Sequence, residues 1–200
     1  FNAEEREELV LICRDSARDL RETDVNDKAM FESELNDILE GAKLKMSRTN
    51  EKVRIRVAAR DSANAQIKAL VAEANARINA SYDRSEMVAI ADKTIFKINR
   101  LLTADAIVHY AEKNKYMIGE MDFLTSDEKK SLSDEINSLK ASSAESAGIA
   151  ENLTVLGFIW SSFDERLQEI YRGGNEKNLS RSKDEHLYLF ENEVDKLSAD

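Results

Sequence analysis

The sequence predicts an all-α protein, and three observations support this. Among its 200 residues there is no proline and there are only six glycines, so residues that interrupt helices are rare. Hydrophobic residues make up 42% of the chain and recur at intervals of three and four, the spacing of one face of a helix. No segment alternates apolar and polar residues for long enough to predict a strand.

The first predicted helix covers residues 3–20. Its apolar positions from Leu9 to Leu20 follow helical spacing, and four glutamates crowd the first turns, where the helix dipole favours negative charge. Cys13 lies in the same apolar stretch. As the only cysteine it cannot form an intrachain disulfide, so we expect a small buried hydrophobic side chain.

The next two predicted helices cover residues 25–47 and 50–79. About thirty residues at 1.5 Å each make the second of these roughly 45 Å long, more than one short partner helix can cover. Its apolar stripe is interrupted only by a polar gap at 60–62. We therefore expect its first half to complete one bundle and its second half to begin another. This predicts an elongated tandem of three-helix bundles with shared long connecting helices.

Helix-capping patterns mark the starts of the following helices. Asp83-x-x-Glu86 and Thr125-x-x-Glu128 have the spacing of a capping box, in which the first side chain and the fourth satisfy each other's backbone N–H groups. Thr103 is a candidate cap for a helix of its own. We expect the helix after Thr125 to be short and to end near residue 139.

A long helix is predicted over residues 144–172, and its middle is apolar almost all round. We expect Leu153 and Ile159 to lie in the core. The pair Gly173-Gly174 predicts the end of this helix. A pattern beginning at Ser182 predicts a last helix.

The predicted organisation has four parts. Residues 1–80 form a first three-helix bundle, and 81–172 form a second helical unit or units continuing from the long helix. Residues 173–181 are a linker, and 182–200 are a C-terminal helix that starts a further unit.

The charge of the chain disfavours two classes of partner. The net charge is −10, and lysine and arginine are spread along the sequence instead of forming one basic run. Such a surface repels phosphate backbones and anionic membranes, so we expect no nucleic-acid binding. The longest apolar stretch, residues 153–163, is too short for a membrane span, so we expect no membrane insertion.

Signatures of catalysis and of metal binding are missing from the sequence. His109 and His186 lack the Glu-x-x-His and His-x-x-x-His spacings of common metal sites, and no base lies next to Cys13. No glycine-rich phosphate loop occurs. We expect no enzyme, no cofactor and no metal, although a catalytic pair among the 39 carboxylates stays open.

Three aromatic residues are the candidate protein-binding residues: Trp160, Phe163 and Tyr171. Their spacings of 3 and 8 place them on roughly one side of a helix. Tryptophan and tyrosine are enriched at the energetic centres of protein interfaces. The alternative is that this helix is central to its bundle and that the core buries them.

One phrase, Leu124-Thr-Ser-Asp-Glu-Lys-Lys followed by Ile136-Asn-Ser-Leu139, comes after alanine-rich segments such as 65–70 and 74–78. This combination resembles the tandem three-helix repeats of large Gram-positive cell-surface proteins. The resemblance implies a stalk, or a module that binds host plasma proteins, including albumin and immunoglobulins. It supplies no binding residues, because no contact motif of that family matches this chain.

We therefore expect a non-enzymatic helical module of a bacterial protein that is on the cell surface or secreted. It would bind a host protein, an immunoglobulin or another plasma protein, by protein–protein contact. Two alternatives are a passive structural stalk or spacer and a cytoplasmic helical adaptor or regulator.

Overall fold

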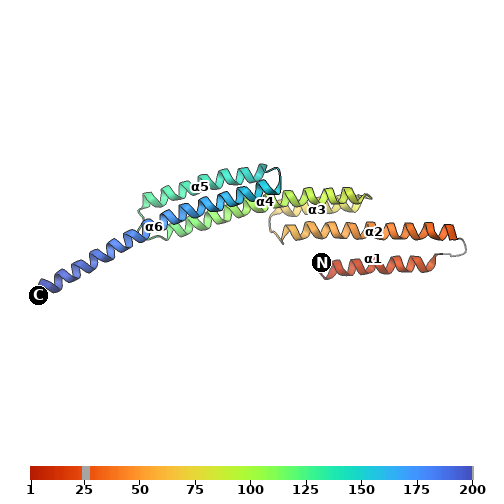
Figure 1. Ribbon diagram of the computed structural model, residues 1–200, viewed down its shortest axis with the longest axis horizontal. Coiled ribbons are helices and arrows are strands. Elements are labelled where there is room, and N and C mark those ends of the chain that lie inside the picture. The colour runs from red at the N-terminus through yellow and green to blue at the C-terminus, as the bar shows by residue number, and fades with distance from the viewer. Residues whose placement is uncertain (24–27, 200) are drawn as a thin grey trace. The chain divides into compact units, whose positions relative to one another are not determined.

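A computed structural model describes residues 1–23 and 28–199 (Figure 1). This part of the chain is all-helical, which confirms the predicted fold class. The helices are α1 (Ala3–Glu22), α2 (Lys28–Ala59), α3 (Ala65–Ala80), α4 (Arg84–Gly119), α5 (Ser126–Ile149) and α6 (Leu153–Ala199).

The chain divides into two compact units, Phe1–Asn99 and Arg100–Asp200. Helix α4 crosses the boundary without a break, so its first part belongs to the first unit and the rest to the second. The predicted boundary after residue 80 therefore lies inside the first unit.

Helix α1 begins as its sequence predicts. Asn2 is the N-cap: its side-chain oxygen accepts from the backbone N–H of Glu5 at 2.8 Å, and the Glu5 carboxylate accepts from the backbone N–H of Asn2 at 2.7 Å. The helix buries Ile12. Cys13 is exposed and not buried as expected, because one residue along a helix turns the side chain by about 100° away from that face.

The predicted long helix over 50–79 is wrong. The chain breaks at Arg60 and Asp61, whose φ angles of 51° are left-handed, and Asn64 then caps α3 by accepting from the N–H of Gln66 at 2.9 Å. The break coincides with the polar gap in the apolar stripe, where a continued helix would have no apolar side chain to bury. The predicted break near residue 48 does not occur: α2 is continuous there, and Thr49, Val53 and Ile55 are buried along it.

The first unit has its core between α2, α3 and the first part of α4. Its most deeply buried apolar residues are Ile55, Ile67, Ile78, Met87, Ala91 and Ile98. At the α3–α4 turn the Arg48 guanidinium lies 5.1 Å from the Tyr82 ring and donates to the Ser81 carbonyl at 2.6 Å. These contacts fix the turn on α2.

Helix α4 begins at the predicted position but runs further than predicted. The Asp83 carboxylate accepts from the N–H of Ser85 at 2.8 Å, whereas Glu86 accepts from the Ser81 hydroxyl at 2.6 Å and so completes no reciprocal box. The predicted helix start at Thr103 is wrong. Apolar residues on both sides of it are fully buried along the same helix, so α4 gains packing by continuing.

The capping box of Thr125 and Glu128 is confirmed, but α5 continues past residue 139 to Ile149. The chain then turns, and α6 begins at Leu153 instead of near residue 144. Leu153 lies in the exposed first turn and not in the core as predicted, because Leu156 fills the core position there. Ile159 packs against the core.

Helix α6 continues through Gly173 and Gly174, so the predicted helix stop, the linker at 173–181 and the helix start at Ser182 are wrong. Gly174 is buried against α5. A Cβ atom there would lie only 3.0 Å from Cδ1 of Leu132. This glycine permits two helices to approach closely and does not end one.

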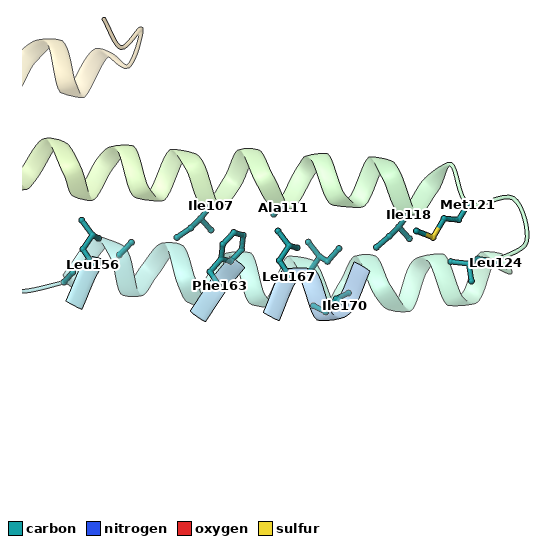
Figure 2. Close-up of a cluster of buried hydrophobic side chains, with 12 residues drawn as sticks. Ile107, Ala111, Ile118, Met121, Leu124, Leu156, Phe163, Leu167 and Ile170 are labelled. Atoms are coloured by element: carbon teal, nitrogen blue, oxygen red, sulfur yellow. The ribbon is translucent and has the colours of Figure 1, made fainter. Parts of the chain in front are cut away.

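The core of the second unit lies between α4, α5 and the first part of α6 (Figure 2). Phe163 extends from α6 toward α4 beside Ile107 (Figure 2). The core residues are Ile107, Ala111, Ile118, Met121, Leu124, Ile136, Ala147, Ala150, Leu156, Phe163, Leu167 and Ile170.

Candidate protein-contact surface

A row of four aromatic side chains crosses from α4 to α6. The rings of His109 and Tyr110 are 5.6 Å apart, those of Tyr110 and Trp160 are 5.5 Å apart, and those of Trp160 and Phe163 are 5.9 Å apart. The first two pairs meet edge to face, the arrangement that the charge distribution of aromatic rings favours. We call these four residues the aromatic row.

The aromatic row runs from the surface into the core. His109 is exposed, Tyr110 is 40% exposed, and Trp160 is half-buried against the core. Phe163 is only 1% exposed, so it packs inside the bundle and is not the exposed contact residue that its spacing suggested. Its ring contacts the Trp160 ring from the core side.

Tyr171, the third candidate residue, is half-buried against the same core. Among the described residues, no ring contact joins it to the aromatic row. The structure therefore brings Trp160 together with Phe163 but leaves Tyr171 apart from them.

The sequence did not identify Tyr110 and His109 as contact residues beside Trp160, because they lie on a different helix. One signal was available in the sequence: Tyr110 stands between the apolar residues Ile107 and Ala111 of one helix face. The structure buries both of these neighbours fully. A tyrosine next to a core position lies at the edge of the buried face, within reach of a neighbouring helix.

A buried polar group lies one turn beyond Tyr110. The Asn114 side chain is 3% exposed, and its Nδ2 donates to the Tyr110 carbonyl at 2.9 Å. Its Oδ1 is buried and has no hydrogen-bond partner within the described part of the chain. A buried acceptor without a partner costs about 1–3 kcal/mol, so Asn114 lowers the stability of the second unit.

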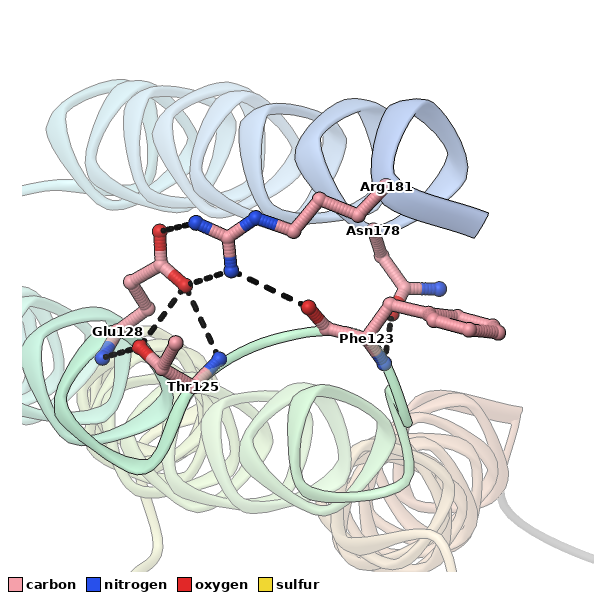
Figure 3. A network of polar contacts seen from close by, with 5 residues as sticks. All are labelled: Phe123, Thr125, Glu128, Asn178 and Arg181. Carbon is pink, nitrogen blue, oxygen red and sulfur yellow. Dashed lines mark hydrogen bonds and ion pairs between the residues drawn. The ribbon is translucent and has the colours of Figure 1, made fainter. Parts of the chain in front are cut away.

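A polar network ties α6 to the start of α5 (Figure 3). Arg181 donates to both oxygens of Glu128 and to the Phe123 carbonyl, and Asn178 accepts from the Phe123 N–H at 2.9 Å. Hydrogen bonds from Arg181, and then from the backbone and hydroxyl of Thr125, lower the pKa of Glu128 from 4.5 to about 2. The network holds α6 against the α4–α5 turn.

The first unit carries an open groove of about 510 Å³ beside the Arg60–Asp61 turn. Its walls combine apolar Ala59, Ile67 and Val71 with the charged side chains of Lys68 and Asp61. In the ranges 1–23 and 28–199, no three His, Cys, Asp or Glu side chains gather closely enough to hold a metal ion. Within those ranges no helix is long and apolar enough to cross a membrane.

No protein-family model, curated protein or solved structure matches this chain.

Proposed function

We propose that this chain is a non-enzymatic helical module of a bacterial surface protein, and that it binds a host plasma protein through the aromatic row. An immunoglobulin is the first candidate partner, because the resemblance to Gram-positive surface repeats implies one. The observation that carries the proposal is the pairing of Tyr110 with Trp160, which come from two helices and rest on buried Phe163.

Physical chemistry supports this surface as a contact site. Tryptophan and tyrosine offer large apolar area with few rotatable bonds, so little conformational entropy is lost when a partner covers them. The ring contacts already restrict the Trp160 side chain before binding. A restricted aromatic pair at the edge of a rigid core is the kind of anchor on which interface energy concentrates.

The finer architecture is also part of the proposal. We propose that the units belong to an elongated tandem of three-helix bundles that share long helices, and the continuity of α4 supports this. A compact 200-residue domain would have a radius of gyration of about 16–17 Å. Small-angle scattering should give a clearly larger value, and a value in that range would refute the elongated tandem.

The test of function is capture from plasma by the immobilised intact protein, with the bound proteins identified by mass spectrometry. We expect an immunoglobulin or another plasma protein to be captured by the wild type and lost with Tyr110→Ser. The matched control is Tyr116→Ser, six residues further along α4, where the tyrosine is 69% exposed and outside the aromatic row. Equal capture by both variants would exclude the row as the binding site.

A passive stalk is the second candidate function, and the unbroken passage of α4 through both units favours it. It predicts that neither the wild type nor any variant captures a plasma protein.

A further inference from the structure

The end of α6 presents an apolar stripe. In residues 182–199, which we call the α6 tail, Leu187, Phe190 and Val194 are exposed and follow each other at spacings of three and four. Figure 1 shows α6 running on past α4 and α5 in the second unit. The tail thus has the stripe of a bundle helix but, in its own unit, no helix alongside it.

The first unit has the converse feature, two helices that lack a third. Helix α3 reaches back along α2 only as far as the contact of Arg48 with Ser81, and the rest of α2 forms a hairpin with α1 (Figure 1). Apolar side chains of this hairpin are incompletely covered: Leu20, Phe31 and Leu35 are half-buried and Leu39 is exposed. The first half of α1 lies beside the part of α2 that α3 also reaches, so we call residues 13–22 of α1 and 30–43 of α2 the open hairpin.

The apolar residues of the open hairpin lie beside the α1–α2 contact and on one side of it. Viewed along α1 from its N-terminus, and at 100° per residue, Leu20, Cys13 and Ala17 lie about 80–140° clockwise from the buried Ile12. By the same construction, Leu35 and Leu39 are displaced by about 60° and about 100° in the same sense from Ile38, which lies beside Asp19 and Thr23 at the end of α1. Because the two helices are antiparallel, equal displacements bring both apolar flanks to one side and form a seat for a third helix.

We propose that the α6 tail of one copy seats in the open hairpin of a second copy and completes a three-helix bundle there. The second unit of the same chain shows this arrangement, since its core is formed by three helices that bury apolar stripes against one another. The occupant is a second copy of this chain because the chain carries both the unpaired helix and the open pair.

Charge complementarity fixes the direction of the tail. Arg14, Arg18 and Arg21 form a row on α1, each directly following a residue of the apolar flank. Arg18 also pairs with Asp15 at 3.4 Å and with Asp19 at 3.6 Å within α1. In the tail, Asp184 and Glu191 lie two turns apart along one edge of the stripe. If the tail lies antiparallel to α1, this acidic edge runs beside the arginine row, whereas the parallel orientation turns it away.

This contact joins two different surfaces, so each pair keeps one free tail on one copy and one free hairpin on the other. Association of this kind adds further copies or closes a ring, and in both cases it increases with concentration. It does not involve the aromatic row, so it can fail while the proposed plasma-protein binding holds, and the reverse.

The test is sedimentation velocity of the full chain over a hundredfold range of concentration. The wild-type mass should rise with concentration, and Phe190→Glu should weaken association by at least about 30-fold. The matched control is Tyr188→Glu, because Tyr188 is 64% exposed against 66% for Phe190 but lies on another side of the helix. A wild type that stays monomeric, or a control that dissociates equally, would overturn the proposal.

A mixing experiment separates this pairing from tail-to-tail association. Leu39→Glu places a charge at an exposed position of the open hairpin and should prevent the tail from binding there. The helicity measured by circular dichroism should not change. Leu39→Glu and Phe190→Glu should each be monomeric alone, yet form a pair of one copy each when mixed, since one retains the tail and the other the hairpin. Unchanged association of Leu39→Glu alone would show that tails pair with tails and would refute the proposal.

Discussion

The substitution Phe163→Ala tests whether the second unit has the core described above. Phe163 is 1% exposed and lies between α6 and α4 (Figure 2). Burial of such a side chain is worth about 1.5–3 kcal/mol. The cavity left by its removal brings the expected loss of stability to about 3–5 kcal/mol.

The matched control is Phe158→Ala, five residues earlier on the same helix. Phe158 is 73% exposed, so the same atoms are removed from water-accessible surface. The expected change in the free energy of unfolding is within about 0.5 kcal/mol. The contrast between the two variants isolates burial from the chemistry of the substitution.

The assay uses an internal probe. Trp160 is the only tryptophan of the chain and lies 5.9 Å from Phe163, so its fluorescence reports on the second unit during denaturation. For a unit of about 100 residues, each 1 kcal/mol corresponds to about 4–8 °C in Tm. Phe163→Ala should therefore lower the melting temperature by more than about 10 °C. Equal melting temperatures for the two variants would refute the assigned core.

Three further predictions concern stability. Asn114→Leu should raise stability by about 1 kcal/mol in denaturant titrations, because it replaces a buried amide whose oxygen has no partner. Glu128→Gln should lower the melting temperature at pH 7; since folding lowers the pKa of Glu128 from 4.5 to about 2, the difference from wild type should shrink as pH falls through that interval. Gly173→Ala should stabilise α6 by about 0.5–1 kcal/mol, because a Cβ there meets no atom within 4 Å. Gly174→Ala should give a smaller gain in stability or a loss, because its Cβ would meet the Leu132 side chain at 3.0 Å. Equal gains from both glycine variants would count against the close α5–α6 approach.

Features set by neighbouring residues were predictable from the sequence. The capping of α1 and the box of Thr125 and Glu128 depend on side chains three residues apart, and both helix starts were found. Ser182-x-x-Glu185 has the same pattern inside α6, and Thr103 is a cap-type residue inside α4. At Thr103 the buried apolar face that continues on both sides outweighs a cap worth about 1 kcal/mol, and only the tertiary packing reveals this.

Glycines illustrate the same limit. Gly173 and Gly174 predict a helix stop from composition, but the approach of Leu132 from α5 gives Gly174 another role. The break at Arg60 and Asp61 was visible as a polar gap, although the left-handed geometry was not.

The candidate site was predictable in part. Trp160 was identified because aromatic residues are enriched in interfaces, but its exposure depends on which side of α6 faces α4. Tyr110 could not be assigned as its partner, because 50 positions of sequence separate two rings whose centroids are 5.5 Å apart.

The most direct test of the proposed function is the dissociation constant for immunoglobulin, measured for the wild type, Tyr110→Ser and Tyr116→Ser under identical conditions. If Tyr110 and Trp160 form the anchor, Tyr110→Ser should weaken binding by about 30-fold, corresponding to about 2 kcal/mol. Tyr116→Ser should bind as the wild type does, since its tyrosine lies outside the aromatic row. Wild-type affinity in Tyr110→Ser, or no immunoglobulin binding by the wild type, would contradict the account.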